Sequence, residues 1–163
     1  MSHIIEDLKG FASLTAGKQK EYFEQVVRDA HSVKVCKMEE VLSPQQIKVV
    51  KSIKYKQKEC FKNATLVTQL LPKVKYVEGK VGAFGLPIGI DHAWNEYNGK
   101  YFDVTAELVL ESEFDEYVAF IEVNAVEVMQ IAINNEFYGS VYYSKFVERY
   151  NIKSKENGKT NKN

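Results

Sequence analysis

The dipeptide Asn98-Gly99 is the feature that most limits how this chain can fold. It separates two segments, 88–97 and 100–105, in which apolar and polar residues mix over a length typical of β-strands. Asn-Gly is a preferred pair for a two-residue hairpin turn, because both central positions of that turn need a positive φ. The sequence therefore predicts an antiparallel hairpin in which Tyr97 lies opposite Lys100.

The predicted register brings polar side chains to one face of the hairpin. Trp94 then lies opposite Asp103, and His92 opposite Thr105; opposed residues share a face, and faces alternate with a period of two. His92 and Asp103 are diagonal neighbours, about 7–8 Å apart at the backbone, a gap that two polar side chains can close. A catalytic base and its orienting carboxylate are arranged in this way. A register slip of one residue would put them on opposite faces.

The remainder of the chain shows helical and strand periodicity in turn. Apolar residues at helical spacing predict helices over 4–30 (interrupted at Gly17), 44–53, 58–71 and 125–134. Alternation with a period of two predicts further strands over 74–80 and 116–123, and 141–150 fits either pattern. We therefore expect an α+β fold, in which N-terminal helices and the 58–71 helix pack on an antiparallel β-sheet of about four to six strands.

Length and composition indicate one domain. A chain of 163 residues with 45% hydrophobic side chains has enough apolar material for one core. We assign residues 1–152 to this domain. The all-polar segment 153–163 is predicted to be a disordered tail.

Cys60 is the best-placed candidate nucleophile. It falls in the first turn of the predicted 58–71 helix, where unpaired backbone N–H groups and the helix dipole stabilise a thiolate. Packing of one face of this helix on the sheet would bring the thiol towards His92. That face comprises Cys60, Asn63, Ala64, Val67, Leu70 and Leu71.

Four short motifs resemble the transglutaminase-like branch of the papain-like cysteine enzymes. They are QKECFKNA (Gln57–Ala64), YVEG (Tyr76–Gly79), HAW (His92–Trp94) and DVT (Asp103–Thr105). The resemblance covers about residues 57–107. It implies a papain-like core, with Cys60 as nucleophile, His92 as base and Asp103 as orienting carboxylate. It also implies a hydrolase or acyltransferase that acts on an amide through a thioester.

The resemblance also suggests how the surroundings of the triad are built. Gln57 is a candidate oxyanion donor upstream of the cysteine, and Trp94 is a candidate wall of the substrate cleft. Val104 stands where the family usually has proline, and no tryptophan follows Cys60 as in the classical transglutaminases. Peptidase, isopeptidase, deamidase and transferase activities all remain open, each with a protein or peptide as substrate.

Each candidate residue also has an ordinary structural explanation. A lone cysteine is most often a packing residue, and a strand histidine or turn aspartate is usually structural. The shared chain order, helix start and strand face favour a catalytic site. Cys60, His92 and Asp103 are potential zinc ligands, but their spacing is not that of zinc motifs, so we expect no metal. The sequence has no phosphate-binding glycine motif, so we expect no cofactor.

The net charge of zero conceals two oppositely charged segments. Residues 1–80 carry 15 basic and 9 acidic side chains, and residues 81–151 carry 3 and 12. Without a global basic surplus we expect no nucleic-acid partner. Lysines gather around Cys60, at Lys54, Lys56, Lys58 and Lys62, and favour an acidic substrate.

The expected compartment is the cytoplasm. Cys36 and Cys60 are too few for a disulfide scaffold, and the N-terminus lacks the basic-then-apolar order of a signal peptide. Charged residues interrupt every apolar run, so we expect no membrane span. The competing hypothesis is an inactive binding module on the same scaffold, for example a phage or prophage protein acting on a host partner.

Overall fold

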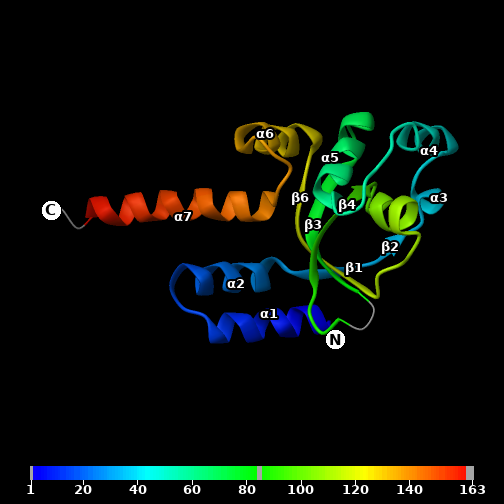
Figure 1. The fold of residues 1–163 in the computed structure, drawn as a ribbon. Coiled ribbons are helices and arrows are strands. Elements are labelled where there is room, and N and C mark those ends of the chain that lie inside the picture. The colour runs from blue at the N-terminus through cyan, green and yellow to red at the C-terminus, as the bar shows by residue number, and fades with distance from the viewer. Residues whose placement is uncertain (1, 84–85, 161–163) are drawn as a thin grey trace.

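The computed structural model describes residues 2–83 and 86–160. Seven α-helices and one π-helical segment are present in this part of the chain: α1 (His3–Leu14), α2 (Gly17–Asp29), α3 (Met38–Val41), α4 (Pro44–Val50), α5 (Cys60–Leu70), η1 (Ala106–Leu110), α6 (Ala125–Asn135) and α7 (Val141–Thr160). The strands are β1 (His31–Val33), β2 (Val35–Cys36), β3 (Lys75–Gly82), β4 (Ile90–Tyr97), β5 (Lys100–Phe102) and β6 (Glu116–Val123). The fold is therefore mixed α and β (Figure 1).

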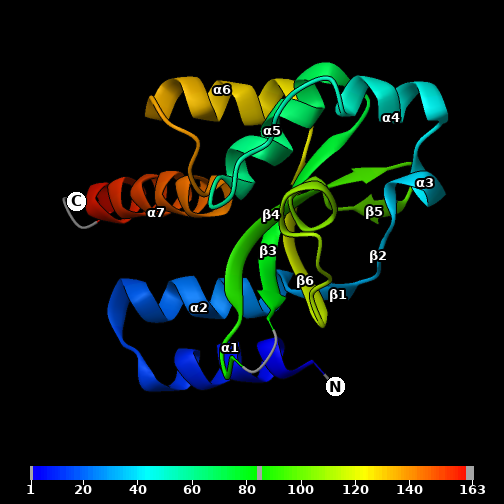
Figure 2. The same cartoon turned by 45° about the vertical axis from the view of Figure 1, so that its right-hand side comes forward.

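The six strands form one sheet in the order β1-β6-β3-β4-β5-β2. β1 and β2 lie at opposite ends of this order, although only Lys34 separates them in the chain. The sheet is therefore curled until its two ends meet (Figure 2). The expectation of a wholly antiparallel sheet is wrong, because β2 pairs with β5 in parallel. Strands of two and three residues are too short to show alternation in the sequence.

Both faces of the central strands are covered. On one face, Tyr76 of β3 and Ala93 of β4 pack against Ala64 of α5 and against the starts of α6 and α7. On the other face, Val77 and Trp94 pack with aromatic residues of β6 and of the loop before it. Central strands buried on both sides fix the backbone positions from which polar side chains project.

The helical hairpin α1–α2 and the helix α7 extend from the sheet beside one another (Figure 1). Tyr22 of α2 makes edge contacts with Tyr142, Tyr143 and Phe146 of α7, at ring-centroid distances of 5.1 to 6.0 Å. Residues 153–160, predicted to be disordered, continue α7 as helix to Thr160. Residues 161–163 of the predicted tail lie outside the described residues.

Local signals in the sequence explain several element boundaries. Ser43 caps α4 by accepting from the backbone N–H of Gln46, and Pro44 is the first helical residue. The 58–71 helix begins at Cys60 rather than at residue 58, because Lys58 adopts a positive φ of 63°. The positive φ angles of Asn98 and Gly99, 53° and 80°, confirm the predicted hairpin turn.

Candidate active site

The β4–β5 hairpin has the register that the sequence predicts. The pairs are Tyr97↔Lys100, Glu96↔Tyr101 and Asn95↔Phe102. The predicted strand 100–105 ends at Phe102, so the expected pairs of Trp94 with Asp103 and of His92 with Thr105 do not form. The chain turns there into a helical segment, which Asp103 holds through its side chain. Its Oδ1 accepts from the backbone N–H groups of Thr105 and Ala106, at 2.9 and 3.0 Å. This capping fixes the direction of the carboxylate.

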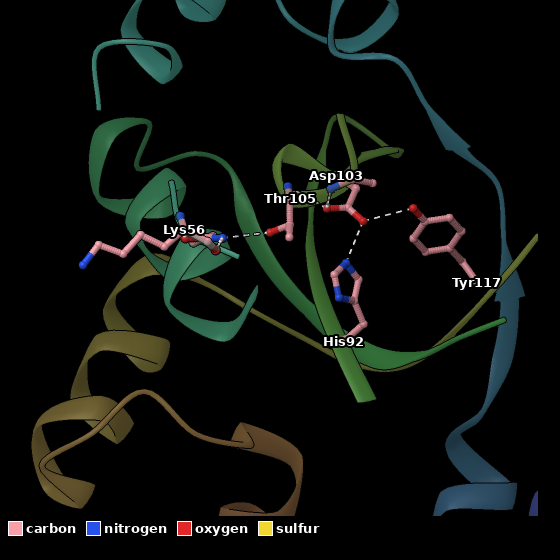
Figure 3. Close-up of polar contacts among 7 residues, drawn as sticks. Lys56, His92, Asp103, Thr105 and Tyr117 are labelled. Atoms are coloured by element: carbon pink, nitrogen blue, oxygen red, sulfur yellow. Dashed lines mark hydrogen bonds and ion pairs between the residues drawn. The ribbon is translucent and has the colours of Figure 1, made fainter. Parts of the chain in front are cut away.

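The second oxygen of Asp103 binds His92. Nε2 of His92 lies 2.7 Å from Asp103 Oδ2, and the Tyr117 hydroxyl donates to the same oxygen over 3.0 Å (Figure 3). His92 and Asp103 are only 4% and 2% exposed. Each carboxylate oxygen thus has two partners, which hold the side chain in one orientation.

The surroundings of His92 make it a stronger base than an ordinary histidine. Burial lowers the pKa of the His92 ring, but the charge and hydrogen bond of Asp103, together with a hydrogen bond to Cys60, raise this pKa to about 9. The imidazolium is therefore the form that the site favours near neutral pH.

Cys60 lies close enough to the His92 ring to raise its pKa. Because Nε2 faces Asp103, Nδ1 is the nitrogen left for the thiol. Cys60 is the first residue of α5 and is partly buried. The N-cap residue Glu59 makes no side-chain hydrogen bond to this helix start, so the N–H groups of the first turn have no side-chain partner among the described residues.

Asn63 joins the start of α5 to the turn after β5. Its Nδ2 donates to the Lys56 carbonyl at 2.8 Å and to the Thr105 hydroxyl at 3.1 Å, and its Oδ1 accepts from the Lys56 N–H at 3.2 Å (Figure 3). Asn63 is 1% exposed, so these hydrogen bonds are shielded from water. The thiol and the carboxylate are thereby held in one rigid frame.

Helix α5 lies on the face of β4 opposite to the one from which His92 projects. Helix α5 packs over Ala93 and Asn95, which alternate with His92 along the strand, and Asn95 donates to the Ala64 carbonyl at 3.0 Å. Within the described residues β5 pairs with β4 only as far as Asn95, so the strand edge beside His92 is open. The sequence predicts that α5 packs on the face that carries His92. The helix instead packs on the face of Ala93 and Asn95, and Cys60 lies near the His92 ring at the start of the helix.

Trp94 is buried in the sheet, whereas Gln57 is exposed at the surface. Trp94 is completely buried and stacks on His92, with ring centroids 6.2 Å apart and an interplanar angle of 20°. It therefore supports the ring from inside, and does not form the open cleft wall that the sequence suggests, because both faces of β4 are covered. Gln57 lies exposed in the turn before α5.

Two aromatic residues of the site were not identified from the sequence. Tyr117 of β6 binds Asp103, and burial and the Asp103 charge raise the pKa of its hydroxyl. Phe114, in the loop before β6, makes an edge contact with His92 at 5.0 Å. Strand alternation could have placed Tyr117 on an inward face, but nothing local specifies that β6 lies on the far side of β3 from β4.

A cavity of about 240 Å³ adjoins the carboxylate side of the site. Asp103, Phe114 and Tyr117 line it together with residues 34–37, which include Cys36. The cavity therefore gives solvent or a small group access to the Asp103 side of the site.

Other classes of site were also sought in the structure. The described residues contain no group of three or more His, Cys, Asp or Glu side chains arranged to hold a metal ion. Among the same residues, no helix has the length and apolar character that crossing a membrane requires.

Comparison with known proteins gave no relative: no family model, no curated protein and no solved structure matches this chain.

Proposed function

We propose that this protein is a cysteine-dependent hydrolase or acyltransferase of the transglutaminase-like, papain-like type, acting on an amide of a protein or peptide. The observation that carries the proposal is the buried His92 ring, with Nε2 on Asp103 at 2.7 Å and with Cys60 near enough to raise the pKa of the ring. A thiol, an imidazole and a carboxylate in this sequence of contacts form the Cys-His-Asp arrangement of acyl-transfer enzymes.

In the proposed resting site the proton of the Cys60 thiol already lies on Nδ1 of His92, as a thiolate–imidazolium pair, and in the first half of the reaction the sulfur attacks the amide carbonyl carbon. The carbonyl π electrons move to oxygen, and the N–H groups of the first turn of α5 stabilise the resulting oxyanion. The His92 imidazolium then protonates the amine as the C–N bond breaks, which leaves a thioester on Cys60.

In the second half, water or an amine attacks the thioester while His92 accepts its proton. The C–S bond breaks, which restores the thiolate–imidazolium pair. Asp103 holds the ring in one orientation and stabilises its positive charge throughout.

Alkylation with fluorescent iodoacetamide at neutral pH tests the proposal, with Cys36 as an internal control. Activated thiolates react faster than ordinary thiols, so Cys60 should be labelled at least about tenfold faster than Cys36. Cys60→Ala should abolish the fast phase, Cys36→Ala should preserve it, and His92→Gln should slow it. Equal labelling rates at both cysteines, or a fast phase unchanged in His92→Gln, would contradict the enzyme proposal and favour the inactive binding module.

Activity itself is measured by cleavage or amine exchange on a library of peptides with fluorogenic amides. Turnover that is present in the wild type and absent in Cys60→Ala supports an enzyme. Release of the free acid distinguishes a hydrolase from a transferase, which instead joins the acyl group to an added amine.

A further inference from the structure

A run of lysines leads along the surface to Cys60. Residues 48–62 contain six lysines and a single acidic residue, Glu59. Glu59 pairs with Lys62 over 3.5 Å. The remaining five form no ion pair within residues 2–83 and 86–160: Lys48, Lys51, Lys54, Lys56 and Lys58. We call these five the lysine surface.

The backbone that carries the lysine surface is held in place. Tyr55 is buried and donates its hydroxyl to the Val50 carbonyl at 2.8 Å, so Lys54 and Lys56, on either side of it, are exposed. Asn63 binds both backbone groups of Lys56. The Lys56 ammonium extends away from the His92–Asp103 pair, towards the outside of the molecule (Figure 3). A fixed backbone lowers the entropy that is lost when a ligand binds such charges.

An acidic segment limits the size of ligand that this surface can take. Residues 51–55 share a shallow hollow with Leu108 and Val109 of η1. Two acidic residues, Glu107 and Glu111, stand close to Leu108 and Val109 in the chain. A long polyanion such as a nucleic acid would meet this negative charge, whereas a short acidic peptide can lie on the lysines alone.

We infer that the lysine surface binds an acidic stretch of the polypeptide substrate and so delivers the neighbouring amide to Cys60. The inference rests on the proposed function, because it assigns the substrate class of that same site. Lys58 stands two residues before Cys60 in the chain, so acidic residues next to the reacting group can reach the lysines while the carbonyl reaches the sulfur. Opposite charges also accelerate encounter between enzyme and substrate.

The test measures binding in the absence of chemistry. The probe is a fluorescein-labelled peptide with one glutamine between two runs of glutamate, and its anisotropy is followed with the Cys60→Ala chain at about 50 and about 300 mM salt, where charge screening differs. In this background, Lys54→Gln/Lys56→Gln/Lys58→Gln should weaken binding about fivefold to tenfold at low salt, since each exposed charge contributes modestly. The matched control is Lys73→Gln/Lys153→Gln/Lys155→Gln, at exposed positions away from Cys60, which should bind as before.

Three results would overturn the inference: equal weakening in both triple variants, binding unaffected by salt, or tighter binding of a single-stranded oligonucleotide with the same number of charges. The outcome is separable from that of the proposed function. Slow labelling of Cys60 together with tight, lysine-dependent peptide binding would reject the enzyme and keep the acidic-peptide surface. Fast labelling without lysine-dependent binding would support the enzyme and reject the acidic-peptide surface.

Discussion

Asp103 serves two purposes with the two oxygens of one carboxylate. Oδ1 holds the backbone turn that follows β5, and Oδ2 holds the His92 ring and the Tyr117 hydroxyl. The local fold and the orientation of the base therefore depend on the same side chain. For this reason Asp103→Asn is a poor probe of catalysis alone, and the His92 ring is the better residue on which to test the electrostatics of the site.

The raised pKa of His92 predicts a loss of stability at alkaline pH. Its pKa is about 9 in the folded chain against 6.5 for an ordinary histidine, so the folded state binds the proton more tightly. The stabilisation is complete below pH 6.5 and is lost as the pH rises through 9. The raised pKa of His92 contributes on the order of 2–3 kcal/mol to the free energy of unfolding.

Urea unfolding at several pH values between these limits measures this effect. The wild type should lose free energy of unfolding as the pH rises, and His92→Gln should show a flatter dependence over the same range. Parallel curves for the two proteins would contradict the assignment of the raised pKa to His92.

At the scale of elements, the hairpin was predictable because its turn chemistry is local. Asn98-Gly99 specifies the turn, and the turn fixes the register of the three pairs that form. The ladder ends at Asn95↔Phe102, so His92 meets Asp103 through the turn after β5 and not as a cross-strand neighbour. The sequence predicted that Cys60 lies in the first turn of a helix. It did not predict that β5 ends at Phe102 and leaves the edge of β4 beside His92 unpaired within the described residues. Tyr117 could not be assigned to the site, because its approach depends on the β3–β6 pairing, which shifts register at Glu78/Gly79.

The start of α7 depends on a buried carboxylate from the sheet. Glu78 of β3 is 4% exposed and accepts from the Ser140 hydroxyl, from the backbone N–H groups of Val141 (2.7 Å) and Tyr142 (3.3 Å), and from the Tyr76 hydroxyl (2.9 Å). A carboxylate at a helix N-terminus satisfies otherwise unpaired N–H groups and complements the helix dipole. No short-range pattern reveals a contact across more than sixty residues, which is why 141–150 fitted either helix or strand.

Glu78→Gln should therefore destabilise the protein although it preserves size. The amide keeps one acceptor oxygen for the N–H groups, but its NH2 replaces the oxygen that accepts from Ser140, and the negative charge that complements the helix dipole is lost, at an expected cost of about 1–3 kcal/mol. Urea unfolding measures this cost. Glu148→Gln, at an exposed position on α7, is the matched control and should change the free energy of unfolding by less than about 0.5 kcal/mol. Equal effects of the two substitutions would show that α7 does not depend on Glu78.

At the scale of the whole molecule, the curled sheet brings together groups that are distant in the chain. Gly79 lies at its centre, paired with His92 on β4 and with Ala119 on β6. A Cβ at Gly79 would stand 1.9 Å from the Val118 carbonyl oxygen, so only glycine permits this approach of β6 to β3. The same approach lets Tyr117 of β6 and His92 of β4 bind one carboxylate.

Gly79→Ala should consequently damage stability and the site together. Relieving the clash requires β6 to move from β3, at an expected cost of about 3 kcal/mol or more. The movement should weaken the Tyr117–Asp103 hydrogen bond and slow the fast alkylation of Cys60. Gly10→Ala is the control: a Cβ there meets nothing within 4 Å in the middle of α1, so it should stabilise by about 0.5–1 kcal/mol. Urea unfolding and labelling kinetics on both variants measure the two effects. A Gly79→Ala chain with wild-type stability and labelling would show that the close approach of the two strands does not hold the site together.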